Sequence, residues 1–303
     1  VAIVVAHAVR GLPGSLWLDE AYTFAAMHDL PRSVTQTHGT MAAYYAVMWA
    51  WGLFGSAVWW VRLPSVLFAL ATLVVTRSIA RRIGGHLLAA VAVPLLALVP
   101  LFEEKAVEAR SYSLMTLLIA VAWYVTLRAD AATTARAGRW WWALVPLGLV
   151  GALVHGLFAV HLLPVVGVAV LGRRPGVALL RVCPGVVAAG ATAAALHAGG
   201  ASGVGTHIPG GVGVWTRATV STLLPGPPLL RLALVATVAA GVAASVLAVV
   251  RSPADRRAHA AVPVLWTVGP VVGLMALSLV APRFNPRYLA PITPGLALCL
   301  GMA

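Results

Sequence analysis

The 303-residue chain is 61% hydrophobic and only 10% charged, with a formal net charge of +13. Soluble domains carry about 25% charged residues, so this composition excludes an ordinary soluble core and predicts a polytopic membrane protein in contact with lipid. A large positive charge often indicates nucleic-acid binding. Here the arginines lie in short clusters between apolar runs, which is typical of membrane anchoring. We therefore expect no nucleic-acid partner.

The apolar runs predict an all-α bundle of about ten membrane spans. A full span needs about 20 residues, and flanking tryptophans and arginines extend the shorter runs to the membrane interface. The first and last runs are cut by the chain ends, so we interpret residues 1–303 as a single transmembrane domain and a fragment. The runs are 1–9, 63–79, 87–101, 111–128, 141–155, 157–172, 176–197, 231–250, 261–281 and 289–303.

The charges orient the bundle. If the first loop lies outside, twelve of the 21 basic residues lie in the cytoplasm, as the positive-inside rule requires; they are Arg77, Arg81, Arg82, Arg128, Arg136, Arg139, Arg173, Arg174, Arg181, Arg251, Arg256 and Arg257. Two acids accompany them, Asp130 and Asp255. The other acids then all lie outside: Asp19, Glu20, Asp29, Glu103, Glu104 and Glu108.

Three segments need a decision about their course. Residues 10–62 form the first external loop, and the run 41–55 within it is best placed as an interfacial helix, because a crossing there would reverse the charge distribution. The run 141–172 is expected to be a hairpin that turns near His155 and Gly156. The Gly/Pro-rich stretch within 198–230 predicts an external loop with little regular structure.

The outer face gathers the residues that could carry chemistry. Asp19 and Glu20 come from the first loop, Glu108 and Arg110 from the loop after the third apolar run, and Arg287 with Tyr288 from the segment before the last run. A carboxylate can deprotonate an acceptor hydroxyl, and arginine binds phosphate through two parallel hydrogen bonds. This combination suits a reaction on a phosphate-bearing lipid.

Simpler roles compete for several of these residues. The pair Asp19-Glu20 could be a solvated helix start, where carboxylates favour the helix dipole. Glu103 and Lys105 are expected in a solvated turn. His155 and His161 are expected to make buried polar contacts, since no spacing of His, Asp and Glu resembles a zinc or calcium site.

Several short motifs resemble the GT-C superfamily of membrane glycosyltransferases, in particular its protein O-mannosyltransferase and aminoarabinose-transferase branch. The motifs occur in the expected order: Leu-Trp-Leu-Asp-Glu-Ala-Tyr at 16–22, Tyr44-Tyr45 leading to Leu-Phe-Gly at 53–55, Arg-Leu-Pro-Ser at 62–65, Arg81-Arg82, Glu-Ala-Arg-Ser-Tyr at 108–112 and Arg-Tyr-Leu-Ala-Pro at 287–291.

The resemblance implies an inverting transfer of one sugar, mannose at the family level, from a polyprenyl-phosphate donor to an acceptor hydroxyl outside a bacterial plasma membrane. Asp19 would be the general base or the acid that orients the acceptor, with Glu20 supporting it, and Glu108 would be the acid of the second loop. Arg287 and Tyr288 would contact the lipid phosphate. The remaining expected substrate-binding residues are Arg110, Tyr44, Tyr45 and His38.

Two points of the resemblance stay open. Relatives often carry a histidine directly before the paired tyrosines, whereas His38 is followed by Gly-Thr-Met-Ala-Ala before Tyr44. Some GT-C enzymes use a divalent cation such as Mg²⁺ or Mn²⁺ and others use none. The adjacent carboxylates permit a cation without requiring one, and no metal ligands are assigned.

Two other functions remain as alternatives. A lipid or sugar transporter would place ionisable groups near the middle of the membrane and often shows inverted repeats, but these runs are nearly free of charge and show no repeat. A non-catalytic membrane scaffold is the second alternative, and the intact Asp19-Glu20 pair argues against it. The sequence identifies neither the sugar nor the acceptor, which could be a protein, a lipid or a glycan.

Overall fold

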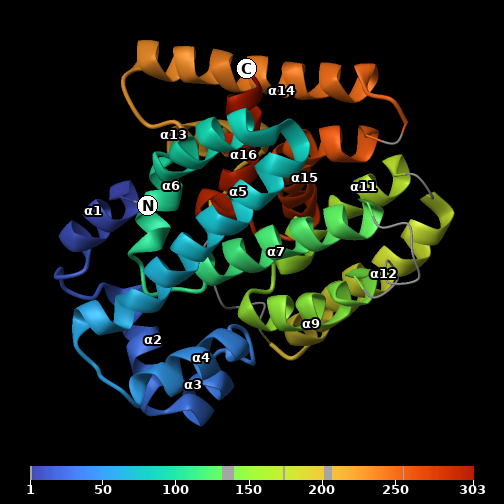
Figure 1. Cartoon of the computed structure of the whole chain (residues 1–303). Helices are drawn as coiled ribbons and strands as arrows, with labels where there is room; N and C mark the ends of the chain where they lie inside the picture. Colours follow the sequence, from blue (N-terminus) through green and yellow to red (C-terminus); the bar gives the residue numbers. More distant parts are fainter. Residues whose placement is uncertain (1, 132–139, 173–174, 201–206, 255) are drawn as a thin grey trace.

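The computed structural model describes residues 2–131, 140–172, 175–200, 207–254 and 256–303, all of them in helices, turns or irregular segments. No strand occurs in these ranges, so the expected all-α class is confirmed (Figure 1). The predicted cytoplasmic positions Arg136, Arg139, Arg173, Arg174 and Asp255 lie outside the described residues.

The helices follow one another with short connections. In chain order they are α1 (Ala2–Gly11), α2 (Leu18–His28), α3 (Leu30–Gln36), α4 (Ala42–Gly52), α5 (Val58–Ala97), α6 (Pro100–Ala106), α7 (Tyr112–Ala131), α9 (Leu144–Val154), α10 (Phe158–Leu162), α11 (Val165–Leu171), α12 (Pro175–Ala198), α13 (Val212–Leu223), α14 (Pro228–Arg251), α15 (Arg257–Val280), the 3₁₀ helix η2 (Pro286–Ile292) and α16 (Thr293–Met302).

Five of the described helices are long and apolar enough to cross a membrane: α5, α7, the part of α12 from Ala178 to Ala198, α14 and α15. Helix α5 accounts for two of the expected spans, because it bends at Gly84 and Gly85. Gly85 has a φ of +72°, a conformation that costs glycine little and other residues more. Arg81 and Arg82 lie directly before this bend.

The first loop contains the short helices α2, α3 and α4, which gather at one end of the molecule (Figure 1). Helix α4 has 11 residues. At 1.5 Å per residue it is only about 16 Å long, too short to cross a hydrocarbon core of about 30 Å. Residues 42–52 therefore cannot form a span by themselves, which agrees with the interfacial helix expected over 41–55.

The expectation of little regular structure within 198–230 is wrong for residues 212–223, which form α13. Trp215, Thr219 and Leu223 recur every four residues and are all buried, so one face of this segment has the spacing of an amphipathic helix. The many surrounding glycines and prolines hid that pattern. The helix begins after Gly211 and ends before the Pro-Gly-Pro-Pro stretch at 225–228.

The chain turns between α9 and α10, where the sequence predicts a hairpin. Helix α9 ends at Val154, and the Nδ1 atom of His155 accepts a hydrogen bond from the backbone N–H of Leu157 at 3.2 Å. Helix α9 packs closely on α12: a Cβ atom added to Gly148 would lie 2.3 Å from the carbonyl oxygen of Gly185. Small residues at such a crossing allow two membrane helices to approach closely.

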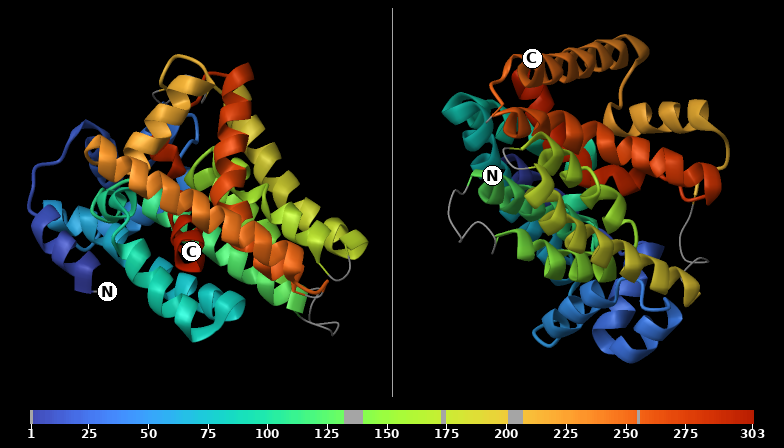
Figure 2. Two further views of the ribbon diagram at one scale, coloured as in Figure 1. Left: turned by 90° about the horizontal axis from the view of Figure 1, so that it is seen from above. Right: turned by 90° about the vertical axis from the view of Figure 1, so that its right-hand side faces the viewer.

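The centre of the bundle is built on aromatic residues of α7 and α15. Trp123 and Trp266 are fully buried and stacked, with ring centroids 5.5 Å apart. The indole N–H of Trp266 donates to the carbonyl oxygen of Pro291 at 2.7 Å, which ties η2 to the core. Helix α14 lies at the outer edge of the bundle beside α15 and α16 (Figure 2), and most of its side chains face outward.

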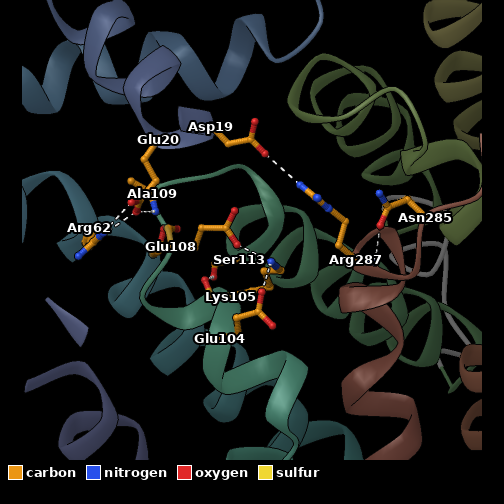
Figure 3. A network of polar contacts seen from close by, with 11 residues as sticks. Asp19, Glu20, Arg62, Glu104, Lys105, Glu108, Ala109, Ser113, Asn285 and Arg287 are labelled. Carbon is orange, nitrogen blue, oxygen red and sulfur yellow. Dashed lines mark hydrogen bonds and ion pairs between the residues drawn. The ribbon is translucent and has the colours of Figure 1, made fainter. Parts of the chain in front are cut away.

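Two of the arginines predicted in the cytoplasm share one aromatic partner. The guanidinium groups of Arg82 and Arg128 lie 5.3 and 6.0 Å from the centre of the Tyr124 ring. These contacts bring the bend of α5 and the end of α7 together. Asp19, Glu20 and Glu108 gather instead where α2 meets the loop after α6 (Figure 3).

Candidate functional site

A buried ion pair between Glu20 and Arg62 organises the site (Figure 3). Arg62 Nε donates to Glu20 Oε1 at 2.8 Å, and Arg62 Nη2 donates to Glu20 Oε2 at 2.6 Å. Glu20 is fully buried and Arg62 is 6% exposed. The remaining donors of Arg62 bind the carbonyl oxygens of Gly11, Gly14 and Ser15. Arg62 thus fixes the segment that leads into α2.

Glu20 also connects the first loop with the second. Its Oε1 atom accepts from the backbone N–H of Ala109 at 2.9 Å, and its Oε2 atom accepts from the N–H of Trp17 at 3.3 Å. Burial alone would raise the pKa of Glu20, but the hydrogen bonds from Arg62 and Ala109 and the charge of Arg62 outweigh it and hold the pKa below its usual value. Glu20 is therefore an ionised structural carboxylate with both oxygens occupied.

The Asp19 side chain points away from the Glu20–Arg62 ion pair and toward Arg287 (Figure 3). Its Oδ2 atom accepts from Arg287 Nη1 at 2.9 Å, and the two side chains are 28% and 30% exposed. The carbonyl oxygen of Asp19 accepts from Arg110 Nη1 at 2.9 Å. The Arg287 guanidinium also lies 5.9 Å from the centre of the Trp17 ring. One loop residue thus joins three segments that are distant in sequence.

The position of Arg287 is set by η2. The Asn285 side chain accepts from the Arg287 backbone N–H at 3.1 Å and caps this helix. The His161 ring N–H donates to the carbonyl oxygen of Tyr288 at 2.9 Å. His161 is therefore a buried polar contact, as expected. Helix α13 supports the same segment, because Trp215 stacks on Phe284.

Lys105 is buried, so the expectation of a solvated turn is wrong at this position. Its ammonium group donates to Glu108 Oε2 at 2.5 Å and to Glu104 Oε1 at 2.6 Å, and it lies 5.2 Å from the centre of the Tyr112 ring. The backbone of this short segment folds inward because Ser113 and Ser65 donate to the carbonyl oxygens of Lys105 and Glu108. Glu103 is half-buried.

Glu108 is buried together with Lys105, and its Oε1 atom has no hydrogen-bond partner among the residues that the structure describes. Burial raises the pKa of Glu108, and the nearby positive charges of Lys105 and Arg110 offset this only in part, so the pKa stays above its usual value. Glu20 and Glu108 are thus two buried carboxylates whose environments move their pKa values in opposite directions.

A cavity of about 650 Å³ is lined by Arg110, which binds the carbonyl oxygen of Asp19, and by Tyr288, the chain neighbour of Arg287. Asp19 and Arg287 themselves are not among its described lining residues. The polar lining of the cavity comprises Thr40, Arg110, Tyr112, His155, His197, His207, Arg283 and Tyr288. Two arginines and no carboxylate among the lining residues suit an anionic ligand. The apolar part of the wall comes mainly from α12 and α15 and comprises Leu157, Ala193, Leu196, Leu277 and Val280. The cavity therefore combines a cationic region with a hydrocarbon-like wall.

Of the expected substrate-binding residues, Arg110 and Tyr288 line this cavity, and Arg287, Tyr44, Tyr45 and His38 are not among its described lining residues. Tyr44 and Tyr45 are 0% and 1% exposed and belong to the hydrophobic core; burial raises the pKa of both phenols. Their rings therefore pack into the core beneath the first loop, and no ligand contact is assigned to them. His38 is exposed, with a φ of +50°, and lies against Gly200.

The carboxylates do not fit a divalent cation. Both oxygens of Glu20 accept hydrogen bonds from Arg62, and Asp19 is paired with Arg287. Among the residues that the structure describes, no group of three or more His, Cys, Asp and Glu side chains could hold a metal ion. We derive no catalytic step through a cation.

The arrangement of the helices has counterparts among solved structures. ArnT from Cupriavidus metallidurans in the apo state superimposes with a TM-score of 0.69 and 17% identity, over 99% of this chain and 57% of ArnT. The chain has the fold of ArnT. ArnT bound to undecaprenyl phosphate matches with a TM-score of 0.65 and 18% identity, over 99% of this chain and 58% of ArnT.

The chain thus spans somewhat over half the length of ArnT. No protein-family model and no curated protein sequence matches it. The likeness to ArnT confirms the all-α helical bundle predicted from the sequence, and five of the described helices are long and apolar enough to cross a membrane.

Sequence reasoning missed two residues of this region. Arg62 is part of a motif but received no role, although an arginine at the start of an apolar run requires a partner, and Glu20 was a nearby candidate in the same loop. His155 lines the cavity and lies between the rings of Tyr112 and Tyr288, at centroid distances of 5.7 and 5.3 Å. Its signal was its place at the turn predicted within the apolar stretch 141–172.

Proposed function

We propose that this protein is an inverting glycosyltransferase that moves one sugar from a polyprenyl-phosphate donor to an acceptor hydroxyl. The Asp19–Arg287 pair beside the cationic cavity is the observation that carries this proposal. It brings a carboxylate that can accept a proton next to a group that binds phosphate. The undecaprenyl phosphate in the similar ArnT structure supports a donor of this kind.

The proposed reaction is a single displacement at the anomeric carbon. The acceptor oxygen forms the new bond to that carbon while the bond from the carbon to the phosphate oxygen breaks. The electron pair leaves with the phosphate, and the proton of the acceptor passes to Asp19. Arg287 stabilises the charge that develops on the phosphate, with Arg110 and Tyr288 facing the cavity beside it. Inversion follows because base and leaving group act from opposite faces.

Glu20 and Glu108 have supporting roles in this proposal. Glu20 holds α2 so that the neighbouring Asp19 faces Arg287, and it acts through position because both its oxygens are occupied. Glu108 keeps Lys105 buried close to Tyr112 at the cavity wall. His38 keeps no assigned contact. We place the reaction on the external side of a bacterial plasma membrane, where the positive-inside rule puts the acidic loops.

The test is transfer of label from a panel of radiolabelled polyprenyl-phosphate sugars, starting with mannose, in membranes that contain the full-length protein. Arg287→Ala is expected to abolish most transfer by weakening donor binding. Arg32→Ala is the matched control, because Arg32 is exposed on α3 and its side chain has no assigned role. Equal transfer by wild type and Arg287→Ala would refute the assigned phosphate site. Uptake of a free lipid or sugar without transfer would favour the transporter alternative.

A further inference from the structure

The ion pair between Asp19 and Arg287 occupies both groups that the proposed reaction needs. Asp19 Oδ2 accepts from Arg287 Nη1 at 2.9 Å. While this contact lasts, that oxygen is not available to the proton of an acceptor, and that nitrogen is not available to the donor phosphate. Because both side chains are partly exposed, a ligand can reach the contact and compete for it.

We propose that the Asp19–Arg287 pair is a latch which the donor phosphate opens: the phosphate takes Arg287, and Asp19 is released as the base only when the donor is bound. This inference rests on the proposed function and adds an order of binding to it, with the lipid donor before the acceptor.

Phosphate can replace the carboxylate on Arg287 by general chemistry. Guanidinium binds phosphate with two parallel hydrogen bonds, whereas the Asp19 carboxylate binds Arg287 through Nη1. The donor is a phosphodiester with one negative charge, as a carboxylate has, so the exchange keeps the charge on Arg287 balanced. Arg287 also comes from a segment held by Asn285 and Trp266. The guanidinium therefore exchanges one partner for another while its backbone stays in place.

The surroundings of Asp19 let its side chain move alone. Arg110 binds the backbone carbonyl of Asp19 and not its carboxylate, so rotation of the side chain leaves that contact intact. The next residue, Glu20, anchors the same helical turn through Arg62. Release of Asp19 thus requires a change of one side-chain rotamer, without displacement of α2. Arg110 also lines the cavity, so the latch lies at its edge.

The latch predicts that loss of the base tightens donor binding. We would measure equilibrium binding of radiolabelled undecaprenyl phosphate to the detergent-solubilised full-length protein. Asp19→Asn should bind about two- to fivefold more tightly than wild type, the range expected when a partly exposed ion pair no longer competes. Arg287→Gln should bind more weakly, and adding Asp19→Asn to Arg287→Gln should produce no tightening, because no latch remains to be opened.

Asp29→Asn is the control for general charge repulsion. It removes one negative charge from the opposite end of α2, where Asp29 caps α3, and asparagine can keep the cap on the Arg32 backbone N–H. The control should bind like wild type. The latch is overturned if Asp19→Asn binds the lipid phosphate as wild type does or more weakly. It is also overturned if Asp19→Asn tightens binding equally in the Arg287→Gln background, or if Asp29→Asn tightens it equally. These outcomes leave the donor assignment in place. Failure of wild type to bind any polyprenyl phosphate would overturn the proposed function and the latch with it.

Discussion

Arg62 binds Glu20 through two of its nitrogens, at 2.8 and 2.6 Å, and also donates to four backbone carbonyl oxygens, those of Gly11, Leu12, Gly14 and Ser15. This one side chain joins α5, the entrance of α2 and, through Glu20, the loop at Ala109. The proposed base, Asp19, is the neighbour of Glu20. The geometry of the site therefore depends on an ion pair that takes no part in the chemistry.

Removing one member of this pair should strongly destabilise the fold. Arg62→Met leaves the carboxylate of Glu20 buried without its counter-ion, and breaking a buried pair in this way costs about 3–5 kcal/mol. Thermal unfolding in detergent should show a large fall in Tm. Arg217→Met, a change at an exposed position of α13, should leave Tm unchanged. A similar small effect for both variants would refute the structural role.

The pH dependence of stability should follow the lowered pKa of Glu20. A carboxyl whose pKa is lower in the folded state contributes stability that is present above its ordinary value of 4.5 and is lost as the pH falls through the folded-state pKa. The Tm difference between wild type and Glu20→Gln should therefore be full at neutral pH and shrink below pH 4.5. A difference that stays constant down to pH 3 would contradict the ionised assignment.

Glu108 should show the opposite slope, because its pKa is raised by burial. Its contribution to stability is full below its ordinary value of 4.5 and is lost as the pH rises through the folded-state pKa. Glu108→Gln, which resembles the protonated form, should gain in Tm relative to wild type as the pH rises from 4.5 to 7. Thermal unfolding of both proteins in the same buffers measures this difference in Tm. If the gain of Glu108→Gln over wild type falls as the pH rises, the charge of Lys105 outweighs burial in setting the pKa of Glu108.

Close packing of α9 on α12 should tolerate no side chain at Gly148. The added Cβ of Gly148→Ala would meet the backbone of Gly185 at 2.3 Å, and such overpacking costs about 1–3 kcal/mol. Gly190→Ala is the matched control on α12, since nothing lies within 4 Å of its added Cβ. Alanine should stabilise that helix by about 1 kcal/mol or less. Tm changes of the same sign in both variants would refute the close crossing.

The sequence predicted the helical membrane fold because long apolar runs and the arginine clusters between them are visible directly along the chain. It also identified Asp19, Glu108, Arg110 and Arg287 as residues of one region, through their order and their side of the membrane. The sequence did not show which of these side chains contact one another, and the structure does. The contact between Asp19 and Arg287 joins residues 268 positions apart.

Burial was harder to predict than position. Lys105 reads as a surface residue, yet Glu108 and the ring of Tyr112 provide partners that permit an ammonium group in the interior. Tyr44 and Tyr45 read as ligand contacts but pack into the core. Helix α13 was hidden by glycines and prolines on both sides. Lys105 finds Glu108 and Tyr112 within the next seven residues, whereas Trp215 of α13 stacks on Phe284, which is far away in the chain.

The central claim is that Asp19 accepts the proton of the acceptor while Arg287 holds the donor phosphate. Its most direct test is transfer from the lipid-linked sugar that wild type uses best, measured for wild type and Asp19→Asn in membranes with equal amounts of full-length protein, with polyprenyl-phosphate binding measured in parallel. The account predicts that Asp19→Asn retains binding and loses transfer by a factor of about 10² or more. Transfer at the wild-type rate by Asp19→Asn would contradict it.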